Sequence, residues 1–162
     1  GHLMTLGLLF ETYPDAWIVQ THRDPAKTMP STASTAAMVQ WMRSDEVDLV
    51  ALVQGIEAAF VAALNGVGSL RDGGTLPSRF IDVHFQQLLR DPVASLRAAY
   101  DGMDRPFTAA HADRIRRYLD DKPRGKFGVH RYLAEEWGFD PRELQQRMKP
   151  YIDRFGVALE DG

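Results

Sequence analysis

The sequence predicts an α/β protein in which helices flank a small parallel sheet. Two apolar runs of strand length, residues 17–21 and 79–85, are rich in β-branched and aromatic side chains. The long stretch between them carries apolar positions at helical spacing, which is the pattern of a helical crossover between parallel strands. Two parallel strands do not make a stable sheet. We therefore expect the later part of a larger α/β domain, or a domain completed by something else.

The helical segments are delimited by turn and capping residues. Pro14 follows the first segment, Pro25 opens the second, Asp45 precedes the third and Thr108 caps a later one. The predicted helices cover residues 3–13, 25–42, 46–64, 92–103, 108–118, 133–137 and 141–155. Residues 65–77 hold four glycines without apolar periodicity, so we predict a loop there.

Composition is that of an ordinary globular protein, and we expect one domain over residues 1–162. The hydrophobic fraction is 44%, the charged fraction 25% and the net charge −3. This acidic balance argues against a general nucleic-acid binder, so no nucleic-acid partner is expected. The chain has no cysteine, which excludes disulfides and fits a cytoplasmic location.

Two further partner classes are not expected from the sequence. No apolar run is judged long enough to span a bilayer, so we expect no transmembrane segment. The five histidines lack metal-ligand spacing, and no metal site is predicted. The exposed sheet edge and the apolar stretch 47–64 leave room for a homo-oligomer.

The first candidate site lies where the strand at residues 17–21 ends. It is followed by His22, Arg23, Asp24 and Pro25, so Arg23 is expected at the handover from strand to helix. Ligands bind at this end of the strands in open α/β sheets. Arg23 with serine hydroxyls on the following helical turns, Ser31 and Ser34, forms a plausible phosphate clamp. An ordinary solvated turn explains the same spacing equally well.

The second candidate site is the segment 122–131, in which five basic side chains lie within ten residues. The glycines Gly125 and Gly128 interrupt it, and glycine lets a backbone approach an anion closely. A solvated basic loop is the alternative interpretation.

Together these two segments resemble the sulfotransferases that use 3′-phosphoadenosine 5′-phosphosulfate. In that family a strand leads into an Arg-x-Pro turn with a serine eight positions after the arginine, and Arg23 and Ser31 have this spacing. The resemblance implies that both residues hold the 3′-phosphate of the cofactor. Residues 81–92 are similar to a later strand and helix of the family, and the resemblance covers roughly residues 1–157.

The family's later basic loop, Arg-Lys-Gly-x-x-Gly, is matched in part. Pro123 replaces the first arginine, while Arg124 keeps the basic position before the paired glycines. The resemblance implies that this loop also touches the 3′-phosphate. The loop residues assigned to cofactor binding are Lys122, Arg124, Gly125 and Lys126.

The resemblance also implies a P-loop NTPase-like sulfotransferase fold. Its first strand and its 5′-phosphosulfate loop are expected upstream of residue 1, because the glycine-rich stretch 66–74 follows a helix and lacks the Lys-Ser/Thr ending of a P-loop. Gly1-His2-Leu3 matches the end of the family's Lys-Ser-Pro-x-His-Leu segment, which makes His2 the candidate general base. The alternative is that Gly1-His2 is a remnant of an expression tag. His22, weighed as a competing base, is expected to be a structural hydrogen-bonding residue.

The function implied by the resemblance is transfer of a sulfuryl group to a hydroxyl. The donor is 3′-phosphoadenosine 5′-phosphosulfate (PAPS), the nucleotide product is adenosine 3′,5′-bisphosphate (PAP), and the acceptor is a small molecule, a glycan, a lipid or a glycolipid. Residues 1–162 alone are expected to have little activity. Two alternatives are a P-loop-type kinase and a non-catalytic or truncated nucleotide-binding homologue.

Overall fold

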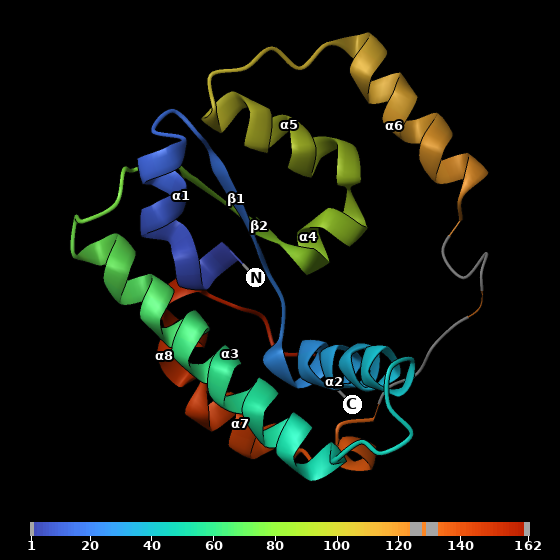
Figure 1. The fold of residues 1–162 in the computed structure, drawn as a ribbon. Coiled ribbons are helices and arrows are strands. Elements are labelled where there is room, and N and C mark those ends of the chain that lie inside the picture. The colour runs from blue at the N-terminus through green and yellow to red at the C-terminus, as the bar shows by residue number, and fades with distance from the viewer. Residues whose placement is uncertain (1, 124–127, 129–132, 161–162) are drawn as a thin grey trace. The chain divides into compact units, whose positions relative to one another are not determined.

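The structure is a computed structural model that describes residues 2–123, 128 and 133–160. Two strands, β1 (Ile18–His22) and β2 (Phe80–His84), are separated by long helices (Figure 1). The helices are η1 (His2–Thr5), α1 (Leu6–Thr12), α2 (Pro25–Trp41), α3 (Leu49–Asp72), α4 (Phe85–Arg90), α5 (Pro92–Gly102), α6 (Ala109–Asp121), η2 (Glu135–Trp137), α7 (Pro141–Arg147) and α8 (Lys149–Phe155).

The two strands form a parallel pair, as the helical crossover between them predicts. Ile18 pairs with Phe80 at one end of the register, and His22 pairs with His84 at the other. Both strands therefore end, at their carboxyl termini, on a histidine. In parallel α/β sheets this is the end at which ligands bind.

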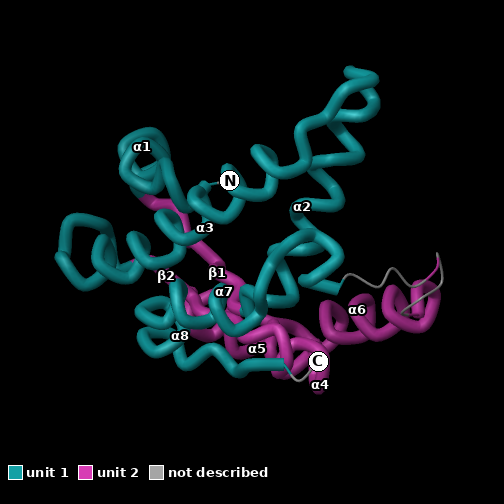
Figure 2. Tube along the Cα trace, turned by 90° about the horizontal axis from the view of Figure 1, so that it is seen from below, with its two compact units in different colours: residues 1–14, 23–78, 132–162 teal, residues 15–22, 79–131 magenta. Residues whose placement is uncertain are grey.

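The chain divides into two compact units, which Figure 2 colours separately. One unit comprises residues 1–14, 23–78 and 132–162, and the other comprises residues 15–22 and 79–131. In the first unit, α2 packs against α3 and α7, and the buried core includes Met29, Ala33, Leu144 and Met148. In the second unit, α4 and α5 pack against β2. That the whole chain forms one domain stays a prediction.

The helix α3 extends eight residues beyond its predicted end, so the loop predicted over residues 65–77 is wrong for residues 65–72. Tertiary contacts explain the difference. Asn65 bridges to the helices after it, because its amide donates to the Arg147 carbonyl at 3.0 Å and its carbonyl accepts from the Tyr151 backbone N–H at 3.2 Å. Val67 is buried, and Gly68 lies against Arg154. These contacts offset the cost of glycine in a helix, about 1 kcal/mol per residue.

The beginning of α3 and the helix α4 also differ from the predictions. The helix begins at Leu49 because the Asp48 side chain caps it, accepting from the Ala51 backbone N–H at 3.0 Å, whereas Asp45 was expected to open it. The helix α4 follows β2 directly, with no side-chain cap at its start. It therefore lacks the capping residue from which the start of a helix is predicted in a sequence.

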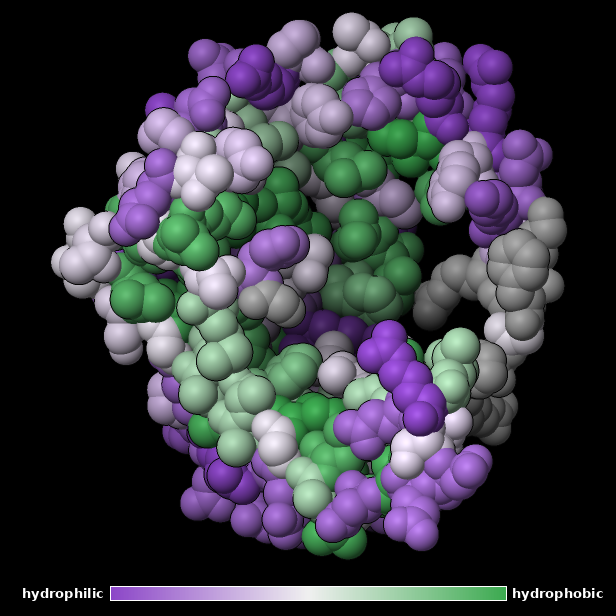
Figure 3. Space-filling model, viewed as in Figure 1, coloured by the Kyte–Doolittle hydropathy of each residue, from purple (hydrophilic) through white to green (hydrophobic). Residues whose placement is uncertain are grey.

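The helix α3 is long and apolar enough, by length and composition, to cross a membrane, and 6% of its most apolar window is buried. This differs from the expectation that no apolar run is long enough to span a bilayer. Figure 3 shows apolar residues, in green, over the surface that α3 forms. A single helix of this kind is weak evidence for a membrane span, because core helices meet the same test. Here α3 packs against α2, α8 and η1.

Candidate functional site

The turn between β1 and α2 is organised by the carboxylate of Asp24, which is completely buried. Its Oδ1 accepts a hydrogen bond from the Ala26 backbone N–H at 2.8 Å and so caps α2, while Pro25 occupies the first helical position. Its Oδ2 accepts from the Gln145 side chain at 3.0 Å and from the Glu160 backbone N–H at 2.9 Å. A single buried group thus fixes the start of α2, one face of α7 and the segment after α8.

Arg23 lies beside this cap and forms a bidentate ion pair with Glu160. Its Nε donates to Oε1 at 2.7 Å and its Nη2 donates to Oε2 at 3.0 Å. The exposed fractions of the two side chains are 34% and 21%, respectively, so the pair lies at the edge of solvent. Arginine presents the same fork to carboxylates and to phosphates. The Nε and Nη2 edge of the Arg23 guanidinium therefore has the geometry of an oxyanion site, and the Glu160 carboxylate occupies it.

Ser31 lies on α2 two turns after Arg23. Lys27 lies between them, and a spacing of four residues puts Lys27 and Ser31 on one stripe of the helix. The Ser31 side chain is half-buried, and its hydroxyl has no hydrogen-bond partner among the residues that the structure describes. A polar hydroxyl on the stripe that follows Arg23 can accept or donate to a ligand. The joint role of Arg23 and Ser31 stays a prediction.

A cavity of about 460 Å³ adjoins the turn. Gln145 and Glu160, the two donors to Asp24 Oδ2, line it, and so do two cations, Lys27 and Arg142. Neither cation has an ion-pair partner within the described parts of the chain. Gln145, Glu160 and Arg142 were not among the predicted site residues, because they lie more than a hundred residues from Arg23 and belong to no motif.

The second predicted site is only partly described. Lys122 ends α6, is exposed, and places its ammonium group 4.8 Å from the centre of the Tyr118 ring. Arg124, Gly125 and Lys126 lie outside the described residues. The expected contribution of this loop to phosphate binding stays a prediction.

His2 begins the helix η1 and is exposed. Its carbonyl oxygen accepts a hydrogen bond from the Thr5 hydroxyl at 3.3 Å. No geometry in the described residues ties its ring to the Arg23 turn, and its role as general base stays a prediction.

A cluster of titratable groups lies at the carboxyl ends of the two strands. The ring of His22 is buried, and its Nε2 lies 2.9 Å from Asp82 Oδ1. The rings of His22 and His84 are 5.3 Å apart between centroids. Burial lowers the pKa of His84, repulsion from His22 lowers it further, and Asp82 acts in the opposite sense. The hydrogen bond fits the structural role expected of His22.

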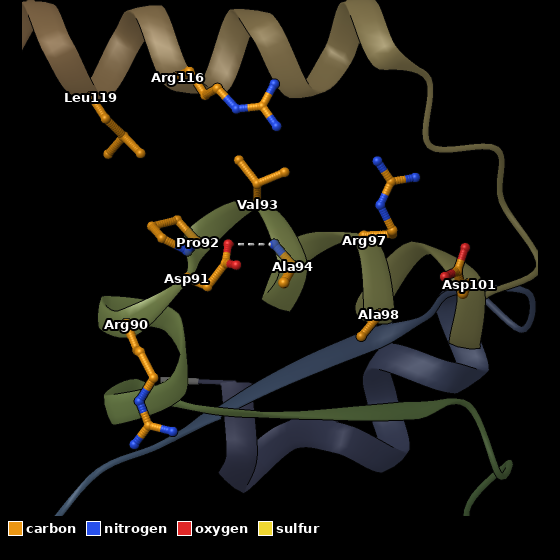
Figure 4. A pocket seen from close by; sticks show the side chains of 10 residues that line it. All are labelled: Arg90, Asp91, Pro92, Val93, Ala94, Arg97, Ala98, Asp101, Arg116 and Leu119. Carbon is orange, nitrogen blue, oxygen red and sulfur yellow. Dashed lines mark hydrogen bonds between the residues drawn. The ribbon is translucent and has the colours of Figure 1, made fainter.

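A different cavity, of about 580 Å³, lies between α5 and α6 (Figure 4). Figure 4 shows Arg97 and Arg116 reaching into the space between these helices. Both are already engaged, because Arg97 donates to the Phe107 carbonyl at 3.2 Å and Arg116 pairs with Asp113 at 2.8 Å. No residue assigned to the site from the sequence lines this cavity. Among the described residues, no group of three or more His, Asp or Glu side chains could hold a metal ion.

Comparison with known proteins gives one family and several relatives. A family model described as the sulfotransferase family matches residues 1–109. The omega-hydroxy-beta-dihydromenaquinone-9 sulfotransferases Stf3 of Mycobacterium bovis and Mycobacterium tuberculosis are each 23% identical over 158 residues, or 96% of this chain. The chain spans 39% of the length of these curated relatives.

The crystal structure of sulfotransferase STF9 from Mycobacterium avium has the same fold. It superimposes with a TM-score of 0.84 and 24% identity, covering 99% of this chain and 41% of that one. The predicted fold class, an α/β sulfotransferase fold of the P-loop-like type, is thereby confirmed.

Proposed function

Because the chain belongs to the sulfotransferase family, we propose that it forms part of an enzyme that transfers a sulfuryl group from PAPS to a hydroxyl. The observation that carries this proposal is the Arg23 turn. A guanidinium fork with a bidentate oxyanion partner stands at the end of β1, followed on α2 by the half-buried Ser31 hydroxyl. We propose that these two residues bind the 3′-phosphate of the donor.

The proposed reaction forms a bond between the acceptor oxygen and sulfur and breaks the bond between sulfur and the 5′-phosphate oxygen. The acceptor proton passes to a base, and PAP leaves with the bonding electrons. A neutral imidazole near pH 7 suits the removal of that proton, and His2 is the residue we propose for it. Arg23, with Lys122, Arg124 and Lys126 of the basic loop, would neutralise the charge of the bisphosphate. Gly125 would let the loop backbone approach it.

For the acceptor we propose a lipid that carries a hydroxyl group. Two curated relatives are named for a hydroxylated menaquinone, which is a lipid. The apolar surface of α3 supports an acceptor of the same class, rather than a glycan or a small polar molecule. The absence of cysteine agrees with a reaction on the cytoplasmic side. Self-association into a homo-oligomer remains part of the proposal.

The proposal is tested by calorimetric titration of the intact protein with PAP and with ATP. PAP should bind more tightly than ATP, and Arg23→Ala should abolish the preference. Arg154→Ala is the matched control, because Arg154 makes a bidentate ion pair with Asp72 in the same unit, through its Nε and Nη2. Preference for ATP would favour the kinase, and binding of neither ligand would favour a non-catalytic homologue.

A direct assay completes the test. The intact protein should release PAP when PAPS is supplied with a long-chain alcohol such as a hydroxylated isoprenoid. Residues 1–162 alone should show little turnover, and full activity in that fragment would contradict the proposal that residues beyond it supply the 5′-phosphosulfate loop.

A further inference from the structure

We propose that Glu160 is an internal competitor at the Arg23 site. Its carboxylate occupies the guanidinium edge that a bound phosphate would use, so a ligand must displace it. The ligand class that meets this demand is a nucleotide with a dianionic phosphate on its 3′ position. This inference rests on the proposed function and adds to it a residue that competes with the 3′-phosphate and lowers its affinity.

Glu160 uses the same Arg23 donors that a phosphate would use. Glu160 takes the Nε and Nη2 hydrogen atoms of Arg23 with its two oxygens, at 2.7 and 3.0 Å. A phosphate binds arginine in the same bidentate way, with two oxygens on two parallel N–H groups. One edge of a guanidinium cannot serve two oxyanions at once, and like charges placed together repel. Binding of a phosphate at this edge therefore requires the Glu160 carboxylate to leave it.

The backbone of Glu160 is held in place by a hydrogen bond of its own. Its backbone N–H donates to the buried Asp24 carboxylate at 2.9 Å, and Gln145 donates to the same oxygen. The main chain is thus held independently of the side chain. Because the Glu160 side chain is 21% exposed, a change of its rotamer can free Arg23 without moving the backbone. The carboxylate stays available to return when the ligand departs.

The cations around Glu160 explain how a phosphate can displace its carboxylate. The cavity that Glu160 lines also contains Lys27 and Arg142, which have no ion-pair partners in the described part of the chain. Lys27 shares a helix stripe with Ser31, so it lies on the phosphate-binding side of α2. A dianion gains more from these cations than the single charge of Glu160 does. A phosphate monoester can therefore displace the carboxylate, whereas a singly charged anion gains less.

The test compares wild type with Glu160→Gln, which keeps the side-chain size and removes the charge. Calorimetric titration of the intact protein uses two probes, PAP and adenosine 5′-monophosphate, which lacks the 3′-phosphate. We expect E160Q to bind PAP about fivefold more tightly, or better, and to bind the monophosphate as wild type does. Glu160→Asp keeps the charge on a shorter side chain and should give a smaller gain.

Asp72→Asn is the matched control, because it removes another bidentate arginine–carboxylate pair from the same unit. It should leave PAP affinity unchanged. Equal or weaker PAP binding by E160Q, with a normal thermal unfolding curve, would overturn the inference and make Glu160 a residue that orients Arg23. That result differs from failure of the proposed function, in which neither wild type nor E160Q binds PAP and this inference falls as well.

Discussion

The buried carboxylate of Asp24 accepts a hydrogen bond from the backbone N–H of Glu160, 136 residues later in the chain. With the bonds from Ala26 and Gln145, this carboxylate has three donors and no exposure to solvent. A buried carboxylate is tolerated only when its oxygens are satisfied. Asp24, the residue next to the predicted phosphate-binding Arg23, therefore stabilises the turn.

Replacing Asp24 by asparagine should destabilise the protein strongly. If the NH2 group of the asparagine takes the place of Oδ2, it faces the donors of Gln145 and Glu160. If it takes the place of Oδ1, it faces the Ala26 N–H. Either way at least one buried group loses its partner, at a cost of about 2 to 4 kcal/mol in the free energy of unfolding. Urea denaturation measures this cost. Asp140→Asn is the control, since Asp140 caps α7 at an exposed position, and it should cost about 1 kcal/mol or less. Equal costs for the two variants would contradict the role of Asp24.

Removing the Ser31 hydroxyl should weaken binding without lowering the stability of the protein. Ser31→Ala loses no hydrogen bond in the described part of the chain, and alanine is a better helix former than serine. If the hydroxyl binds the 3′-phosphate, PAP affinity should fall by about tenfold. Thr32→Val is the control, because the Thr32 hydroxyl is already bonded to the Thr28 carbonyl at 2.9 Å. Unchanged PAP binding by Ser31→Ala would remove Ser31 from the site.

The local part of the site could be predicted from the sequence. Arg23 and its turn were found because an apolar strand that stops at a basic residue and a proline is a signal carried by adjacent residues. Glu160 and Gln145 could not be found in this way. They reach Asp24 from 136 and 121 residues away, and their contacts depend on how α7 and the segment after α8 pack onto α2.

The fold shows the same division between local and distant causes. The parallel pairing of β1 and β2 could be predicted, because a helical crossover separates two strand-like runs. The last two turns of α3 could not be predicted, because glycines in a sequence indicate a loop. Only the structure shows that a neighbouring helix packs closely against them. Gly68 has such a neighbour, with the side chains of Arg154 and Phe155 beside its Cα.

Two glycines in the last turns of α3 should respond to substitution in opposite ways. A Cβ on Gly68 would lie 3.4 Å from Arg154 Cγ and 3.8 Å from Phe155, so Gly68→Leu should overpack this contact and cost about 1 to 3 kcal/mol. A Cβ on Gly66 meets nothing within 4 Å, so Gly66→Ala should raise the free energy of unfolding by about 0.5 to 1 kcal/mol through helix propensity. Urea denaturation measures the free energy of unfolding of both variants. A loss of stability in Gly66→Ala would show that residues 65–72 do not form the helix described here.

The stability of the protein should depend on pH through His84. Burial first, and His22 second, lower the pKa of His84 from its ordinary value of 6.5, so the folded state binds fewer protons than the unfolded chain does. The stability contributed by neutral His84 is fully present above pH 6.5 and is lost as the pH falls from that value toward the lowered pKa. The melting temperature should therefore fall on acidification from about pH 8 to about pH 5. His84→Gln should reduce this fall.

The direct measurement is the titration of the His84 ring followed by proton NMR. The groups that bear on it are His22, which is the other ring of the pair, and Asp82, whose carboxylate lies 2.9 Å from the His22 Nε2. Asp82→Asn removes the opposing influence, so it should lower the pKa of His84 further. The loss of stability should still begin near pH 6.5, but it should become larger and extend to a lower pH. An NMR pKa at or above 6.5 in the folded wild type, or an identical pH profile in His84→Gln, would contradict the arrangement at the ends of β1 and β2.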